Sequence, residues 1–184
     1  PSFCDVEFAG TDVRVRVQGE AKPDYLALTV TEVQGQPIQW LQLVNLRLNI
    51  TQNVGTLVNA AWDDTFAACV LACNDRTESF GADGAKGYLC ARCYPEFGLA
   101  QARAAIIGLP TGVPEPHRTL LAVIGRVERA EGLPHPLRDG VWIKESPERF
   151  RSYLMVHDLG EGNVDEILRI ARGGFGCIEF YPWR

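Results

Sequence analysis

Four cysteines have a spacing that structural zinc sites use. Cys69 and Cys73 are followed by Cys90 and Cys93, which gives the pattern C-x3-C…C-x2-C around a polar, glycine-containing loop. Thiolates in closely spaced pairs are the usual ligands of such sites. The first pair, however, lies inside an unbroken apolar run, residues 66–73, which predicts a buried strand.

The strand interpretation separates these thiols. Along a strand, the Cα atoms of Cys69 and Cys73 are about 13 Å apart, which is too far for one metal ion. Cys90 and Cys93 would point to opposite faces, and free cysteine packs well as a small buried hydrophobe. We therefore expect no metal and no cofactor, while a disulfide between two strands stays open in an oxidising compartment.

Two further sets of residues have a plain structural interpretation. Asp63 and Asp64 could form a catalytic or calcium-binding carboxylate pair, but aspartate is a preferred turn residue, and a hairpin turn is favoured. The histidines, at positions 117, 135 and 157, are far apart and belong to no metal or nucleophile motif. We interpret them as ordinary surface or loop residues.

The end of the chain holds a constellation that points to a ligand. Glu179, Tyr181 and Trp183 alternate along a predicted final strand, residues 175–183, and therefore share one face. Open α/β sheets and (β/α) barrels place their sites at the carboxyl ends of strands. A carboxylate accepts hydrogen bonds from sugar hydroxyls, and an aromatic ring stacks on a sugar's C–H face. The alternative is a packed interior face with a paired glutamate.

The elements before this segment are mainly strands. Seven segments before residue 110 alternate in polarity or form short apolar blocks between turn residues, which predicts a β-sandwich. They are residues 12–18, 25–33, 38–50, 57–62, 66–73, 87–93 and 103–109. In the third segment Trp40, Leu46 and Leu48 share one parity, and we expect them on the buried face. Residues 74–86 are polar and predict a surface loop.

A helix and a connector follow the strands. Residues 115–131 predict an amphipathic helix, with proline near its start and glycine just past its end. Its apolar stripe is Leu120, Val123, Ile124, Val127 and Ala130. Residues 133–150 are rich in proline and predict an extended, irregular connector.

The last segment predicts a strand, a helix and a strand. Residues 152–156 are the first strand, and Asn163 is placed to cap the helix, with Glu166 completing a capping box. The expected buried stripe of this helix is Val164, Ile167, Leu168 and Ala171. Such a unit pairs its two strands in parallel. A lone unit of this kind leaves its sheet incomplete, so we expect the natural chain to continue or another segment to complete it.

The predicted fold is therefore mostly β, in three parts. These are a β-sandwich over residues 1–110, the helix and proline-rich connector over 111–150, and the strand–helix–strand unit over 151–184. The composition is that of a soluble globular protein, with no stretch long enough to span a membrane. A net charge of −5 argues against nucleic acid as the main partner, because phosphate binding needs a basic surface.

The layout resembles the N-terminal region of large, modular glycoside-hydrolase-like proteins of bacteria, in which a β-sandwich leads through a proline-rich connector into a (β/α) barrel. The residues that carry the resemblance are 58–64 (VNAAWDD), 131–136 (EGLPHP), 152–154 (SYL), 163–166 (NVDE) and 174–176 (GFG). The resemblance covers the layout of most of the chain.

The resemblance implies that the segment containing Glu179, Tyr181 and Trp183 is the first barrel strand and that the catalytic carboxylates lie beyond Arg184. The expected function is a carbohydrate-associated region that supports or extends a glycan site, with the rest of a larger chain as partner. Two alternatives stay open, a stand-alone carbohydrate-binding or adhesion module and a zinc-stapled interaction domain. Whether the chain is part of an enzyme is left open by the sequence.

Overall fold

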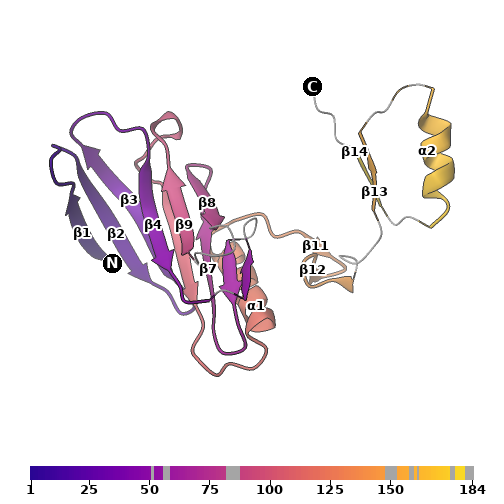
Figure 1. Cartoon of the computed structure of the whole chain (residues 1–184), viewed down its shortest axis with the longest axis horizontal. Coiled ribbons are helices and arrows are strands. Elements are labelled where there is room, and N and C mark those ends of the chain that lie inside the picture. The colour runs from indigo at the N-terminus through magenta and orange to yellow at the C-terminus, as the bar shows by residue number, and fades with distance from the viewer. Residues whose placement is uncertain are drawn as a thin grey trace. The chain divides into compact units, whose positions relative to one another are not determined.

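The computed structural model describes residues 1–50, 52–55, 59–81, 88–147, 153–157, 160, 162–174 and 177–180. Their contacts group the chain into two compact units, Pro1–Pro134 and His135–Arg184, and each is described by itself. The chain is mostly β, and its strand pairs are antiparallel apart from one parallel pair in the second unit (Figure 1). Neither helix in the described part is long and apolar enough to cross a bilayer.

Two sheets make up most of the first unit. The large sheet has seven strands in the order β1-β2-β3-β10-β7-β6-β5, and the small sheet has three in the order β4-β9-β8. The large sheet comprises β1 (Ser2–Glu7), β2 (Arg14–Ala21), β3 (Leu26–Gln34), β5 (Asn53–Gly55), β6 (Ala60–Trp62), β7 (Ala67–Ala72) and β10 (Arg103–Gly108). The small sheet comprises β4 (Leu41–Arg47), β8 (Thr77–Gly81) and β9 (Tyr88–Cys93).

All seven predicted strand segments contain a strand, so this part of the prediction is confirmed. Strands β1, β5 and β8 were not predicted. The loop predicted for residues 74–86 is wrong over β8, which pairs with β9 from Thr77 to Gly81. The segment is polar because β8 is an edge strand whose outer face meets solvent, so it lacks the apolar run of a central strand.

The two sheets share a core between them. Val44 and Leu89 from the small sheet pack in one cluster with Val70 and Ala104 from the large sheet, and all four are buried. A second cluster joins Val15 and Val30 on the large sheet to Leu41 and Cys93 on the small one. Alternation along each strand sends one set of side chains into this layer and the other set away from it.

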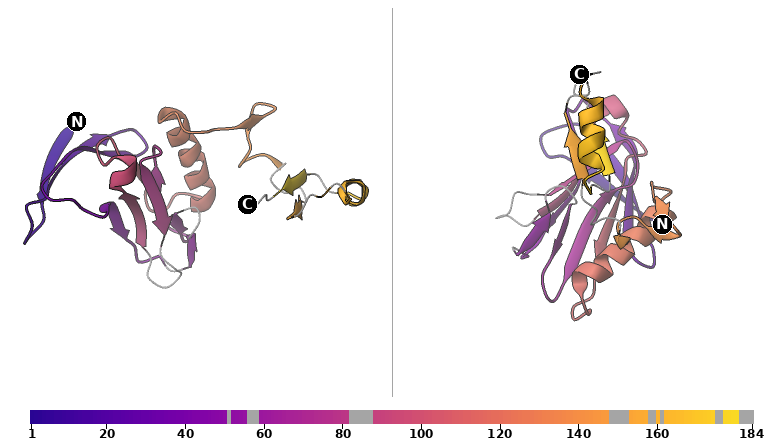
Figure 2. Two further views of the ribbon diagram at one scale, coloured as in Figure 1. Left: turned by 90° about the horizontal axis from the view of Figure 1, so that it is seen from above. Right: turned by 90° about the vertical axis from the view of Figure 1, so that its right-hand side faces the viewer.

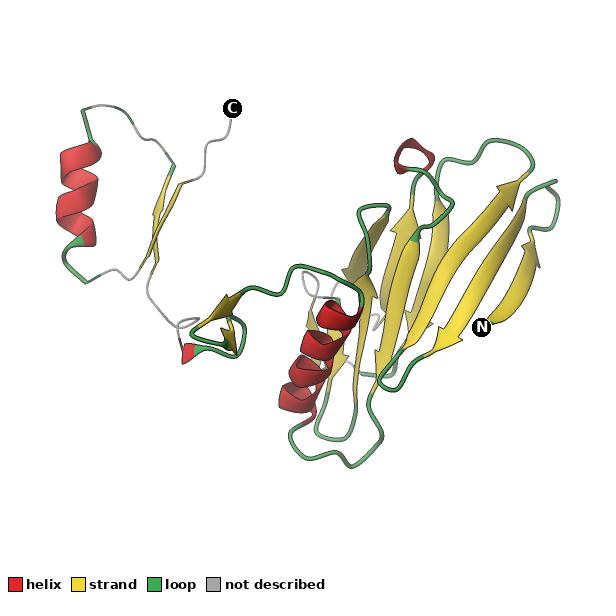
Figure 3. Cartoon of the chain, turned by 180° about the vertical axis from the view of Figure 1, so that it is seen from behind, coloured by secondary structure: helices red, strands yellow, loops and turns green. Residues whose placement is uncertain are grey.

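A helix covers the opposite face of the large sheet. Helix α1 (Pro116–Ala130) lies along this face (Figure 2, Figure 3). It buries Leu120, Val123 and Val127 against a layer that contains Cys69 and Ile107. The predicted amphipathic helix is confirmed, although Ala130 at the end of its stripe is exposed. Gly132 follows with φ of 69°, a left-handed conformation that glycine adopts at no steric cost. A short 3-10 helix, η1 (Pro95–Phe97), joins β9 to the segment before β10.

A β-bulge in β4 overturns part of the predicted core. The pairing of β4 with β9 shifts between Gln42 and Val44, so Leu41 and Val44, three residues apart, both turn inward. Regular alternation would instead have placed Trp40 inside with Val44, and that prediction is wrong, because Trp40 is 46% exposed. Leu46 and Leu48 lie beyond the bulge and pack half-buried against the core, as predicted.

Asn59 ties the two sheets together. Its Nδ2 donates to the carbonyl of Val70 at 2.6 Å and to that of Cys90 at 3.0 Å, one on each sheet. The residue is 1% exposed and has φ of 47°, a left-handed conformation that asparagine adopts more readily than most residues. One buried side-chain amide therefore links the backbones of the two sheets and satisfies a carbonyl group on each.

The second unit begins with a small hairpin. Strand β11 (Leu137–Arg138) pairs with β12 (Val141–Trp142) around Asp139 and Gly140, whose φ angles are 51° and 78°. Two positive φ angles in an Asp-Gly turn are typical of the tight hairpin that matches strand twist. The connector predicted as irregular therefore contains a defined hairpin, and Trp142 in it is buried.

The predicted strand–helix–strand unit is confirmed. Strand β13 (Tyr153–Val156) lies parallel to β14 (Cys177–Phe180), with α2 (Val164–Ala171) between them in sequence. The predicted cap is wrong, because the side chain of Asn163 makes no cap hydrogen bond. Its ψ of 0° is that of a turn rather than the extended backbone a capping side chain needs, and Glu166 pairs with Arg169 at 2.6 Å instead.

The stripe predicted for α2 is only partly buried. Ile167 is buried, whereas Val164 and Leu168 are exposed. Met155 on β13 is exposed as well. Within the described residues, the second unit thus presents apolar side chains to solvent on both its helix and its strand pair.

Packing between the sheets gives a direct test of this arrangement. Leu89 is fully buried, so Leu89→Ala should lower the free energy of unfolding by about 2–5 kcal/mol, through lost burial and a residual cavity. Phe3, which is 60% exposed on edge strand β1, is the control, and Phe3→Ala should change it by no more than about 0.5 kcal/mol. Urea unfolding followed by fluorescence measures both, and equal effects would contradict the assigned core.

Candidate functional site

The site predicted from the sequence is described only in part. Glu179 lies on β14, is exposed, and is in register with the exposed Met155 of β13. Tyr181 and Trp183 lie outside the described residues. The shared face of these three side chains therefore remains a prediction.

The cysteines lie in different layers of the first unit. Cys69 and Cys73 both face the core under α1, while Cys93 faces the core between the sheets. Cys90 lies on the outer side of the small sheet, where its sulfur accepts from Gln42 Nε2 at 3.2 Å. The predictions that the first pair shares a face and the second pair does not are confirmed. The four sulfurs do not converge on a common point, and burial raises the pKa of Cys73 to about 12 and that of Cys93 to about 11.

Asp63 forms a hairpin turn, as favoured from the sequence. Its carboxylate accepts from the backbone N–H and hydroxyl of Thr65 and from the backbone N–H of Phe66, at 2.7–2.9 Å. These bonds hold the pKa of Asp63 below its usual value. They engage the carboxylate in joining β6 to β7 and leave it unsuited to proton transfer.

Two histidines form ring contacts within their own units. His117, in the first turn of α1, stacks on Trp62 with ring centroids 4.4 Å apart. His135 stacks on Trp142 with centroids 4.8 Å apart. Both contacts serve packing, which agrees with the structural interpretation of these residues.

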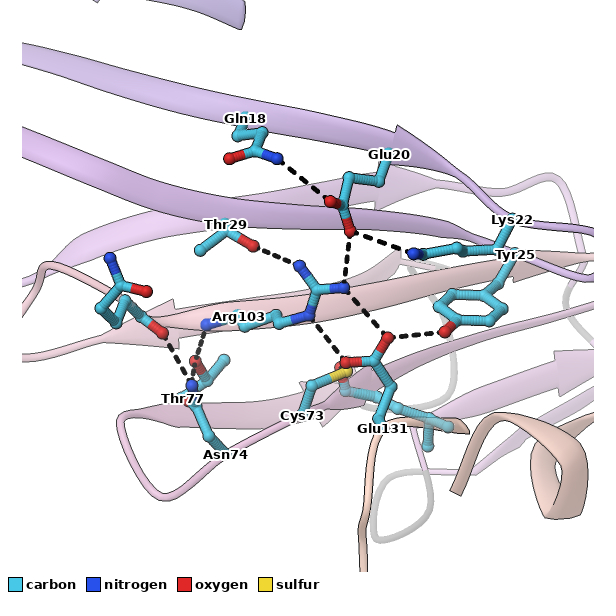
Figure 4. A network of polar contacts seen from close by, with 12 residues as sticks. Gln18, Glu20, Lys22, Tyr25, Thr29, Cys73, Asn74, Thr77, Arg103 and Glu131 are labelled. Carbon is cyan, nitrogen blue, oxygen red and sulfur yellow. Dashed lines mark hydrogen bonds and ion pairs between the residues drawn. The ribbon is translucent and has the colours of Figure 1, made fainter. Parts of the chain in front are cut away.

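An ionic network lies at the end of α1. Arg103 projects from β10 and pairs through Nε with Glu131 at 2.7 Å and through Nη2 with Glu20 at 2.9 Å (Figure 4). Its remaining terminal nitrogen donates to the hydroxyl of Thr29, and Tyr25 donates to Glu131 at 2.6 Å. The network thereby connects β2, β3 and β10 with the residue that ends the helix.

The two glutamates of this network are held in the ionised form and are not suited to acid catalysis. The Arg103 hydrogen bonds hold the pKa values of Glu131 and Glu20 below their usual range. Burial, followed by the bond to Glu131, raises the pKa of Tyr25. A general acid needs a raised carboxyl pKa, so neither glutamate is suited to that role.

The network borders a cleft of about 420 Å³ whose other charged residues are also engaged. Asp24 and Arg126 form a two-bond ion pair at 2.9 Å, and Lys22 lies 3.3 Å from Glu20. Because the basic side chains of the cleft are paired with Asp24, Glu131 and the neighbouring Glu20, the cleft offers little to an incoming charged ligand. We interpret the ion pairs around this cleft as the contacts that fix α1 to the large sheet.

The outer face of the small sheet has a different character. We call it the aromatic face and define it by Trp40, Glu78, Phe80, Arg92 and Tyr94. The guanidinium of Arg92 lies between two rings, 4.6 Å from the centroid of Trp40 and 4.6 Å from that of Phe80. Among the described residues of the first unit, no helix crosses this face (Figure 1).

Polar groups continue across the aromatic face. Arg92 is directly opposite Gln42 on one side and Glu78 on the other, so their side chains form a row. Its Nη1 donates to the Tyr94 hydroxyl at 3.3 Å, which donates to Glu78 at 2.8 Å. Arg92 forms no ion pair with a described residue, and its Nε–H is buried without an acceptor among them. A buried donor left without an acceptor costs about 1–3 kcal/mol.

Sequence reasoning missed both sets of residues. The signal for the network was a single arginine, Arg103, with the same parity as the buried Ala105 and Ile107. The aromatic face was hidden because Trp40 was assigned to the core and Phe80 to a loop. The sequence signal for this face was that β4 has apolar residues of both parities, Leu41 and Val44. Such a pattern indicates a bulge.

Comparison with protein-family models, with curated proteins and with solved structures finds no match to this chain. The geometry of the described residues is therefore the basis for any functional inference.

The Arg103 network predicts a strong and pH-dependent contribution to stability. Arg103→Ala should lower the free energy of unfolding by about 3–5 kcal/mol at pH 7, because it leaves the buried carboxylate of Glu131 without its cation and leaves Glu20 with Lys22 alone. Folding lowers the pKa of Glu131 below its ordinary 4.5, so its contribution is complete above that value and is lost as pH falls through the folded pKa.

Glu131→Gln provides the matching test of this pH dependence. The stability of this variant should fall less steeply than that of the unmodified protein between about pH 5 and pH 3, as measured by urea unfolding. The exposed ion pair of Arg118 and Glu115 is the control, since Arg118→Ala should have an effect of at most about 1 kcal/mol. Parallel pH curves for the Glu131→Gln variant and the unmodified chain would contradict the assigned role.

The cysteine positions predict that the fold does not require zinc. Elemental analysis of the purified chain should find less than one zinc per molecule, and a chelator should leave the unfolding transition unchanged, because the sulfurs do not converge. One zinc per chain, lost together with the fold on chelation, would contradict the assignment.

Proposed function

We propose that this chain is a non-catalytic, glycan-associated region of a larger glycoside-hydrolase-like protein. In this proposal the first unit is a β-sandwich that supports or extends a glycan site. The second unit is the start of a (β/α) barrel, and the catalytic carboxylates belong to other parts of the protein.

The observation that carries the proposal is the aromatic face. It combines a half-exposed indole with a guanidinium, a hydroxyl and a carboxylate at the outer face of the small sheet. Aromatic rings pack on the apolar faces of sugars, and neighbouring polar groups exchange hydrogen bonds with the hydroxyls. Sites on sheets hold their side chains more firmly than sites on loops.

The β-sandwich assignment is supported by the packing of the two sheets. Their inner faces contribute to common buried clusters, as in two-sheet folds. Helix α1 is an addition to that plan, because it covers the outer face of the large sheet.

The barrel assignment is supported by the second unit. Parallel strands joined through a helix are the building block of (β/α) folds, whose sheets are covered on both faces. The exposed Met155, Val164 and Leu168 are the kind of surface that further βα units would cover. In that setting the carboxyl end of β14, with Glu179, Tyr181 and Trp183, would face the glycan site.

The alternative function is a stand-alone carbohydrate-binding or adhesion module. It makes the same use of the aromatic face but gives no reason for the parallel strand pair of the second unit. A zinc-stapled interaction domain receives no support from the positions of the thiols.

The proposed function predicts binding without turnover. The unmodified chain should be retarded in native gels that contain a soluble polysaccharide. It should release no reducing sugar from it, because the proposal assigns the catalytic carboxylates to other parts of the protein. No retardation by any polysaccharide of a broad panel would contradict glycan association. Release of reducing ends that is abolished by a substitution within the chain would contradict the non-catalytic assignment.

The barrel-entry site makes a separate prediction. In the full-length protein, Trp183→Ala should reduce glycan binding or turnover and leave the melting temperature nearly unchanged, if the side chain stacks on sugar at the strand end. Glu179→Gln, at a position that the structure shows exposed, is the companion variant. A melting temperature lowered by many degrees, with binding per folded molecule intact, would show that Trp183 is structural.

A further inference from the structure

We infer that the aromatic face binds an uncharged glycan chain, with Trp40 as the stacking platform and Arg92 and Glu78 as the groups that contact its hydroxyls. This inference rests on the proposed function and deepens it. It places the contact on the small sheet and names the class of glycan.

Trp40 is the half-exposed aromatic ring of this face. It precedes β4 directly and is 46% exposed, although tryptophan usually finds a buried setting in a chain with a core of this size. The guanidinium of Arg92 lies 4.6 Å from its ring centroid and 4.6 Å from that of Phe80. This three-membered stack fixes the orientation of the indole, so less conformational freedom is lost when a sugar packs against it.

The polar groups match hydroxyls better than charges. Arg92 donates to Tyr94, which donates to Glu78, so a cationic donor and an anionic acceptor are joined through one phenol. Glu78 and Arg92 are also directly opposite each other on neighbouring strands. Adjacent hydroxyls of a sugar can accept from a guanidinium and donate to a carboxylate at the same time.

The charge balance of the face favours an uncharged ligand. Arg92 and Glu78 carry opposite charges in register, so the face attracts neither anions nor cations strongly. A carboxylated glycan would gain from Arg92 but would meet Glu78. An uncharged glycan uses both groups without repulsion, and this is the class to which the geometry points.

Affinity electrophoresis of the whole chain tests the inference. The gels contain xylan, mixed-linkage β-glucan or galactomannan as uncharged glycans, and alginate as the carboxylated one. Trp40→Ala should weaken binding of the uncharged glycan about tenfold or more, and Trp40→Phe should restore most of it. Glu78→Gln and Arg92→Gln should each weaken it about threefold to tenfold. Phe97→Ala is the matched control, since Phe97 is exposed in η1 and outside the aromatic face, and it should have no effect.

The possible results distinguish a wrong assignment of the binding site from a wrong proposed function. Circular dichroism and melting temperature confirm that each variant is folded. Binding of uncharged glycans that survives both Trp40→Ala and Glu78→Gln overturns the aromatic face as the site and leaves glycan association intact. Binding to alginate alone, lost in Arg92→Gln and kept in Glu78→Gln, overturns the uncharged class. Absence of binding to every glycan by the unmodified chain overturns both the site and the proposed function.

Discussion

The ion pairs of Arg103 with Glu131 and Glu20 are the constraint on which the first unit depends. One cation on a central strand of the large sheet holds the end of α1, strand β2 and strand β3 in a single arrangement. Charges with this little access to water are tolerated only when their partners are in place, so the sheet face and the helix must form together. The helix therefore covers one side of the large sheet and the small sheet covers the other.

This three-layer order decides which surface can be used for binding. The inner side of the small sheet is committed to packing, through residues such as Leu89 and Ala91. Its outer side buries Cys90 but also displays Trp40, Arg92 and Phe80 in contact. Alternation along β9 turns Leu89, Ala91 and Cys93 inward and brings Arg92 to the aromatic face.

The sequence predicts the strands and helices well but the contacts between them poorly. The period-2 pattern of residues 12–18 and the helical spacing from Leu120 to Val127 each depend on local periodicity, and both elements are found. The partner of Arg103 could not be predicted, because Glu131 is far away in sequence and only the fold brings it near. The aromatic face was missed for a related reason, since the bulge in β4 is fixed by its pairing with β9 and not by β4 alone. The site at the end of β14 stays a prediction.

The bulge in β4 also bears on how this strand can change length. It holds one residue more than its partner opposite, between Gln42 and Val44, and the strand on either side keeps its own inward face. A chain lacking Leu43 would run as a plain strand and still turn Leu41 and Val44 inward and Trp40 outward. The strand can therefore lose one residue at the bulge without turning its other side chains over.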